Sequence, residues 1–175
     1  MRVLSIDPAL RNTGFGVIER LQSATSSRLT YRALAYGTVK NRRDLRQSGC
    51  LVAIREQIRD VIEQHKPDVC AVEGVIFVQS YKTAITMGAA RGAAILTAAE
   101  FGMEVYEYAP RRVKQAVVGK GAADKKQVAL MIRALLGLTE TPDSDAADAL
   151  AIGLAHCYAH DPSRPVSLAD KPQSL

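Results

Sequence analysis

The order in which hydrophobic patterns follow one another most strongly constrains the fold of this chain. Residues 1–8, 13–20 and 29–39 alternate as strands do, and short polar turns separate them. From residue 44 onward, helical periods alternate with short apolar strands. Closely spaced strands pair antiparallel, whereas strands joined through helices pair parallel. The pattern therefore predicts an α/β fold, a mixed sheet covered by helices.

Changes of period, together with proline, place the later elements. A helix is expected over 44–65, and Pro67 ends it before a strand over 68–73. Further helices are expected over 80–100, 111–118, 124–136 and 144–159, with a fifth strand over 103–108. Residues 161–175 are rich in Pro and Ser and are expected to be disordered, which leaves 1–160 as one domain.

Composition is typical of a soluble globular protein. The chain has 175 residues, 47% of them hydrophobic, enough for one domain with a sizeable core. Its three widely spaced cysteines form no metal-binding motif and are expected to be reduced core thiols. No signal pattern and no apolar run near the roughly 20 residues of a membrane span is visible. We expect a cytoplasmic protein, and its net charge of +5 favours an anionic partner.

Four carboxylates stand at the ends of predicted elements, in three separate segments. Asp7 ends the first strand and Glu73 ends the strand over 68–73. Asp145 and Asp148 lie three residues apart at the start of the last helix, so they share one face. Oxygen ligands of this kind suit Mg²⁺ or Mn²⁺, and pairs of such ions cut phosphodiesters. The pattern indicates a metal centre.

Each acid also has a purely structural interpretation. An Asp at a strand end is most often a turn former, and Asp143 and Asp145 fit a helix N-terminus, where caps and the helix dipole favour Asp. Asp148 lies on an apolar helix face and Glu73 follows a buried strand, where an unpaired charge is costly. A bound metal removes that cost at both positions, which favours the functional interpretation.

The second candidate region is the basic segment 111–126. Its cations alternate with valines, and Gly119 and Gly121 form a mobile bend before a helix N-terminus at Asp124. Such a segment can approach a phosphate backbone, although most charged runs are simply solvated. The candidate DNA-binding cations are Arg111, Arg112, Lys114, Lys120, Lys125 and Lys126. The apolar run 75–78 after Glu73 fits a core or a wedge that presents Phe77 to an unstacked base.

Five motifs, in order, resemble the RuvC family, the bacterial Holliday-junction resolvases of the RNase H-like superfamily. The motifs are Ile6-Asp7-Pro8 with Thr13-Gly14-Phe15-Gly16-Val17-Ile18, Ala71-Val72-Glu73, Gly88-Ala89-Ala90-Arg91-Gly92, Val113-Lys114-Gln115-Ala116-Val117-Val118-Gly119, and Asp145-Ala146-Ala147-Asp148-Ala149-Leu150-Ala151. The resemblance covers about residues 1–160. Each motif alone is modest evidence, but five in the same order are specific.

The resemblance implies an RNase H-like fold, with a five-stranded mixed sheet and helices on both faces. It implies a homodimer that makes paired symmetric nicks in four-way DNA junctions, in recombination and repair, with RuvA and RuvB as partners. The four acids match the family's metal-binding catalytic positions, and Lys114 and Lys125 match basic positions near the scissile phosphate. By this analogy two Mg²⁺ or Mn²⁺ ions support hydrolysis, and Asp7 bridges them.

Two positions depart from the family pattern. The family usually has Gly where this chain has Ala9, so that residue needs a backbone conformation open to alanine. The family also places an aromatic residue in the loop after the catalytic Glu, where this chain has Ile76 followed by Phe77. Either residue is a candidate for the wedge that contacts DNA.

Other functions fit parts of the pattern. A nuclease for RNA–DNA hybrids or pre-rRNA would use the same acids. The Asp7 turn is also similar to the phosphate loop of actin-like ATPases, which need two such domains. A non-catalytic DNA-binding scaffold would not need four carboxylates. The small-residue helix over 84–99 fits a dimer contact and packing on the chain's own sheet equally well.

Overall fold

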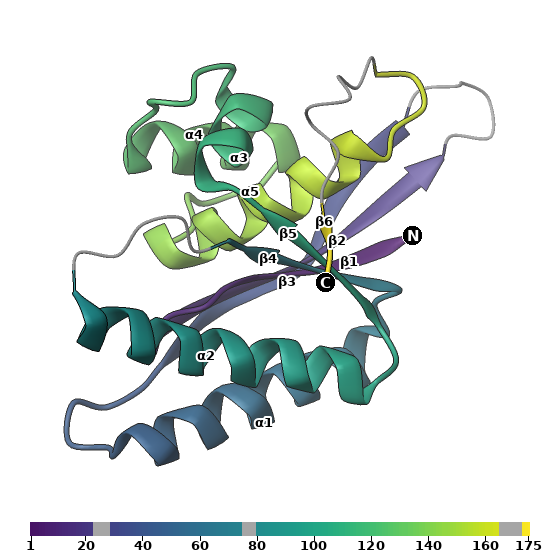
Figure 1. The fold of residues 1–175 in the computed structure, drawn as a ribbon. Coiled ribbons are helices and arrows are strands. Elements are labelled where there is room, and N and C mark those ends of the chain that lie inside the picture. The colour runs from purple at the N-terminus through teal and green to yellow at the C-terminus, as the bar shows by residue number, and fades with distance from the viewer. Residues whose placement is uncertain (23–28, 75–79, 165–172) are drawn as a thin grey trace.

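The computed structural model describes residues 1–22, 29–74, 80–164 and 173–175 (Figure 1). The described strands are β1 Arg2–Asp7, β2 Asn12–Gln22, β3 Leu29–Lys40, β4 Val69–Glu73, β5 Glu104–Tyr108 and β6 Gln173–Ser174. The described helices are α1 Gln47–His65, α2 Tyr81–Glu100, α3 Pro110–Val118, α4 Lys125–Leu136 and α5 Ser144–Ala159. Every element expected from the sequence is present, with ends shifted by at most a few residues.

The strands form one mixed sheet in the order β3-β2-β1-β4-β5-β6. Antiparallel pairing joins β1 to β2 and β2 to β3, and parallel pairing joins β1 to β4 and β4 to β5. This arrangement confirms the predicted mixed sheet. The five predicted strands are confirmed, and a sixth strand extends the sheet, because β6 pairs antiparallel with β5 through two residues near the C-terminus. So short a pair has no hydrophobic period that a sequence could reveal.

Two parts of the segment after residue 160 are described. Asp161 is 4% exposed and accepts a hydrogen bond from the Tyr31 hydroxyl at 2.8 Å. Residues 173 and 174 form β6. Residues 165–172 lie outside the described residues, so the disordered tail and the domain boundary at residue 160 stay predictions.

Helices cover both faces of the sheet (Figure 1). The helices α1 and α2 pack on one face, where Leu4 and Ile6 of β1 join their core. The helices α3, α4 and α5 lie on the other face, and Val3 of β1 belongs to that core. Because side chains alternate along a strand, Asp7 projects toward the face that carries α5. The alternation of side chains along β1 thus places Asp7 on the face covered by α3, α4 and α5.

The helix α5 and the sheet approach each other closely at two glycines. A Cβ atom on Gly14 of β2 would stand 2.0 Å from the backbone oxygen of Asp145. A Cβ atom on Gly153 of α5 would stand 2.7 Å from the Ser5 hydroxyl oxygen. The helix is buried on nearly every side, because α3 and α4 cover its outer face. Its N-terminal acids are therefore held against the end of β2.

The helix predicted from residue 44 begins at Gln47 instead. The preceding residues form a loop, since the Arg11 guanidinium donates to the carbonyl oxygens of Arg42 and Leu45. The three cysteines are free and buried, which agrees with the expectation of core thiols. Within the described ranges, no helix combines the length and apolar character needed to cross a membrane.

Candidate active site

Asp7 and Glu73 end neighbouring parallel strands. The residues before them, Ile6 and Val72, are partners in the register of β1 with β4. The two carboxyl groups therefore project from the same edge on the same face, and Glu73 donates a hydrogen bond to Asp7. Parallel pairing alone accounts for their meeting, because strands that pair in parallel deliver their carboxyl ends together.

Burial and mutual repulsion raise the pKa values of both carboxyl groups. Burial, then the charge of Asp148, raises the pKa of Asp7 to about 6, although the hydrogen bond from Glu73 opposes the rise. Burial, then the charge of Asp7, raises the pKa of Glu73 to about 8. At neutral pH the pair therefore retains a proton on Glu73. Two partly buried carboxyls that repel each other are a favourable place for a cation.

The first turns of α5 bring in the other two acids. Asp143 caps the helix, accepting a hydrogen bond from the Ala146 amide at 2.9 Å and another from the Thr38 hydroxyl at 2.8 Å. Asp145 and Asp148 follow it and are both partly buried. Burial is the largest of the effects that raise the pKa of Asp145. The cap, the link to β3 and the close approach at Gly14 together fix where these acids stand.

Lys125 supplies positive charge to the acids. Its Nζ lies 3.0 Å from Asp148 Oδ2, and this contact is the main cause that raises the pKa of Lys125. Lys125 is the first residue of α4, whose start is fixed by a capping box between Asp124 and Gln127. The predicted helix start at Asp124 is thus confirmed. The capping box sets where the ammonium group can reach.

The four predicted acids lie close enough to perturb one another electrostatically. Asp7 is affected by Asp148, Asp145 and Glu73. As the side chains stand, no three acidic, histidine or cysteine residues of the described ranges are placed to hold a single ion. The carboxyls are satisfied instead by the proton that Glu73 shares with Asp7 and by the ammonium of Lys125.

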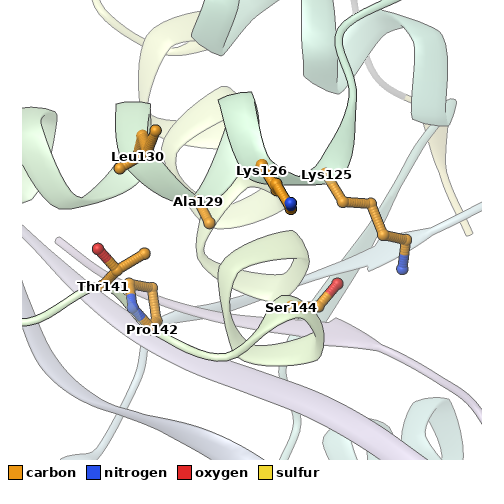
Figure 2. Close-up of a pocket in the computed structure, with 7 residues that line it drawn as sticks. All are labelled: Lys125, Lys126, Ala129, Leu130, Thr141, Pro142 and Ser144. Atoms are coloured by element: carbon orange, nitrogen blue, oxygen red, sulfur yellow. The ribbon is translucent and has the colours of Figure 1, made fainter.

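The predicted basic residues lie on α3, on α4 and between them. Lys114 is half-buried, and the others are exposed: Arg111, Arg112, Lys120, Lys125 and Lys126. A cleft of about 360 Å³ opens beside the acids, between the first half of α4 and the segment before α5 (Figure 2). Its lining residues are Lys125, Lys126, Ala129, Leu130, Thr141, Pro142 and Ser144.

Sequence reasoning missed two groups of supporting residues. Gln115 donates to the Gly119 carbonyl and accepts from the Gly121 amide, both at 3.1 Å, and so fixes the bend between α3 and α4. Arg91 of α2 forms an ion pair with Glu107 of β5 and donates to the Glu73 carbonyl at 3.4 Å. The Arg91 contacts join residues far apart in the sequence, and the Gln115 contacts are local side-chain hydrogen bonds. Hydrophobic periodicity reveals neither, although both residues lie in the quoted motifs.

The two departures from the family pattern have different outcomes. Lys66 is the only non-glycine residue with positive φ in the described part of the chain, so Ala9 has an ordinary backbone conformation. The turn at Ala9 is held by the Thr13 hydroxyl, which donates to the Ala9 carbonyl at 2.6 Å. The wedge candidates Ile76 and Phe77 lie outside the described residues, so the choice between them stays open.

Curated relatives match almost the whole chain. A crossover junction endodeoxyribonuclease RuvC from Akkermansia muciniphila is 54% identical over 162 residues, which cover 93% of each chain. Another from Bradyrhizobium diazoefficiens is 46% identical over 158 residues, which cover 90% of this chain and 87% of the relative.

Solved structures confirm the RNase H-like fold. A structure described as T. thermophilus RuvC in complex with Holliday junction substrate superposes with a TM-score of 0.85 and 34% identity. The match covers 100% of this chain and 99% of that chain. The Fowlpox virus resolvase, with a TM-score of 0.51 and 16% identity, shares the fold alone. The family described as crossover junction endodeoxyribonuclease RuvC matches residues 3–156, and the chain therefore belongs to the RuvC family.

Proposed function

We propose that this protein resolves four-way (Holliday) DNA junctions by paired, symmetric hydrolysis of two phosphodiesters, in recombination and repair. One observation carries the proposal: Asp7, Glu73, Asp145 and Asp148, from three segments, converge beside the cationic start of α4. The structural relative described as bound to a Holliday junction substrate indicates the class of DNA.

The donor set fits divalent metal ions. Four carboxylates offer hard oxygen ligands, and two of them have pKa values raised by burial and repulsion. Glu73 would lose its proton and Asp148 its contact with the Lys125 ammonium if the four acids held a metal. We propose Mg²⁺, with Mn²⁺ as the alternative, and two ions for each site. Such ions, when bound, activate water and stabilise the leaving oxygen.

The chain's own residues have distinct parts in this proposal. Asp7 is hydrogen-bonded to Glu73 on β4 and is affected by the charge of Asp148 on α5, so it would be a ligand shared by the two ions. Lys125, once released from Asp148, offers its charge to the phosphate, and Lys114 on α3 offers a second charge. The turn hydrogen bonds at Thr13 and the cap at Asp143 keep the carboxylates preorganised.

Paired nicks require two active sites, and α2 offers a surface for a homodimer. Tyr81 is 91% exposed, Ile85 69% and Leu96 57%, and these residues recur at helical spacing on the outer face. Gly88 and Gly92 lie on the same face with open space around them. Ala90, Ala94 and Ala98 pack inward instead. The small residues thus serve the protein's own core and leave an apolar strip for a second copy.

The remaining parts of the proposal follow from the family. We propose that the branch-migration proteins RuvA and RuvB act with this protein on the junction, and that it works in the cytoplasm. The proposed contacts to the DNA backbone are the six cations of the segment 111–126, with Ile76 or Phe77 as the wedge: Arg111, Arg112, Lys114, Lys120, Lys125 and Lys126. Co-sedimentation of the protein with RuvA on a labelled junction tests the partnership.

Cleavage of a labelled synthetic junction tests the central proposal, beside linear duplex and an RNA–DNA hybrid. Paired nicks on the junction support resolution. If only the RNA–DNA hybrid were cut, the proposed metal site would still stand, but the substrate would be RNA rather than a DNA junction. Binding without cutting of any substrate would leave a DNA-binding scaffold.

A further inference from the structure

A cluster of cations lies apart from the basic residues of α3 and α4, in the loop between β3 and α1. Residues 40–46 read Lys-Asn-Arg-Arg-Asp-Leu-Arg, with four cations and one anion. All four cations are exposed. We call this segment the basic loop. The chain's net charge is only +5, so such a cluster is a strong local concentration of positive charge.

The basic loop stands near the acids. Asp7 pairs with Gly14, and Gly14 pairs with Thr38, so these three residues form one row across β1, β2 and β3. Lys40 follows Thr38 by two residues and lies opposite Asn12. From strand spacing and rise, the loop begins about 12 Å from the Asp7 backbone, the rise of about four base steps. In Figure 1 the loop lies at the same end of the sheet as the start of α5.

Hydrogen bonds fix the basic loop to the turn that follows Asp7. The Asn41 amide donates to the Arg11 carbonyl at 2.9 Å, and the Asn41 side chain donates to the Leu10 carbonyl at 2.8 Å. The Arg11 guanidinium donates in turn to the carbonyls of Arg42 and Leu45. The loop and the active-site turn are thus held as one unit.

Two of the four cations are available to a ligand. Arg42 forms a two-point ion pair with Asp44, and Lys40 lies 4.0 Å from Asp143. Within the described part of the chain, no hydrogen bond or ion pair engages the side chains of Arg43 and Arg46. The two exposed guanidinium groups repel each other and lack an acidic partner among the described residues. A polyanion, which can pair with both, is therefore the ligand that this arrangement fits.

We propose that the basic loop is a second DNA-backbone contact, in which Arg43 and Arg46 bind phosphates of a junction arm. The cations of α3 and α4 flank the acids on the α5 face, and the basic loop flanks them at the β3 edge. A duplex bound between the two groups has its backbone held on both sides of the reacting phosphate. This inference rests on the proposed function and names a surface of the same site.

Salt-dependent junction binding tests the inference. The wild type and the Arg43→Gln/Arg46→Gln variant bind a fluorescent four-way junction in EDTA, and anisotropy gives Kd from 50 to 300 mM salt. Each lost phosphate contact reduces the slope of log K against log salt by about 0.9. We expect a reduction of about 1.8 in the double variant and roughly tenfold weaker binding at 100 mM salt. Equal melting temperatures verify that both proteins are folded.

The matched control is Lys66→Gln/Arg133→Gln, which removes two exposed charges elsewhere. Lys66 follows α1 at the opposite end of β4 from Glu73, and Arg133 lies in the last turn of α4. We expect its slope to stay within about 0.3 of the wild type. Equal slopes in all three proteins, while the wild type binds and cuts junctions, would overturn this inference alone. Failure of the wild type to bind junctions would overturn the proposed function as well.

Discussion

Lys125 Nζ lies 3.0 Å from Asp148 Oδ2, so the first residue of α4 neutralises an acid in the first turns of α5. The Lys125 side chain is 65% exposed and that of Asp148 20%. Solvent screening limits such a pair to about 1 kcal/mol of stability or less. The contact therefore contributes little to the stability of the fold, and its main effect is to place the Lys125 ammonium group beside the acids.

Lys125→Met is expected to reduce junction cleavage at least tenfold at saturating DNA while lowering the free energy of unfolding by less than about 1 kcal/mol. Single-turnover cleavage and urea unfolding measure the two quantities. Lys126→Met removes the same charge from the next residue, which does not reach Asp148. Its loss of turnover is expected to be at least tenfold smaller. Equal losses in both variants would mean that only bulk charge matters.

Gly14→Ala is expected to displace the start of α5. The new methyl group would stand 2.0 Å from the Asp145 carbonyl oxygen, which is backbone and cannot rotate away. We expect a destabilisation of about 2 kcal/mol or more and loss of cleavage, measured by thermal unfolding and junction nicking. Gly37→Ala is the control, because its methyl meets only ring atoms of Phe15, at 3.1 Å and beyond. If the two variants behave alike, the close approach at Gly14 does not position Asp145.

Ile85→Glu is expected to convert the protein to a monomer. The side chain is 69% exposed on the apolar strip of α2, and a charge there would be buried without a partner in a dimer. Light scattering after size exclusion gives the mass. Leu130→Glu, at a site 58% exposed on α4, is the matched control and should leave the mass unchanged. If the wild type is already a monomer, the proposed homodimer contact on α2 is wrong.

Stability is expected to fall below pH 6.5 because of His156. The ring is 1% exposed and hydrogen-bonds the Tyr108 hydroxyl at 2.9 Å, and burial lowers its pKa from 6.5 to about 3. Below pH 6.5 His156 becomes protonated in the unfolded chain but stays neutral in the folded protein. The free energy of unfolding therefore decreases as the pH falls toward 3. At pH 4 this amounts to at most about 3 kcal/mol.

Urea unfolding at pH 7 and pH 4 compares the wild type with His156→Asn, which keeps a polar atom near Tyr108. Asp7 and Glu73 titrate in both proteins and cancel in the comparison. We expect the variant to lose less stability between the two pH values than the wild type does. An equal loss would show that His156 accepts its proton in the folded protein.

The sequence predicts the elements well, and it identifies four acids that the structure brings close together, for a physical reason. Strand and helix periods are local, and Asp7 and Glu73 end strands whose parallel pairing brings them together. The supporting contacts depend on distant residues, and local periodicity does not reveal them. The two-residue strand β6 and the Arg91–Glu107 pair behind Glu73 are examples. The close approach at Gly14 is another, since the sequence alone does not show what faces a glycine.

The most direct test of the central claim is cleavage of a labelled four-way DNA junction in Mg²⁺ by the wild type, by Asp148→Asn and by Asp143→Asn. The account predicts paired symmetric nicks by the wild type and none in EDTA. Asp148→Asn should bind the junction but not cut it. Asp143→Asn, which retains a capping oxygen, should cut within a few-fold of the wild type. Near-normal cutting by Asp148→Asn, or no junction cutting by the wild type, would contradict the account.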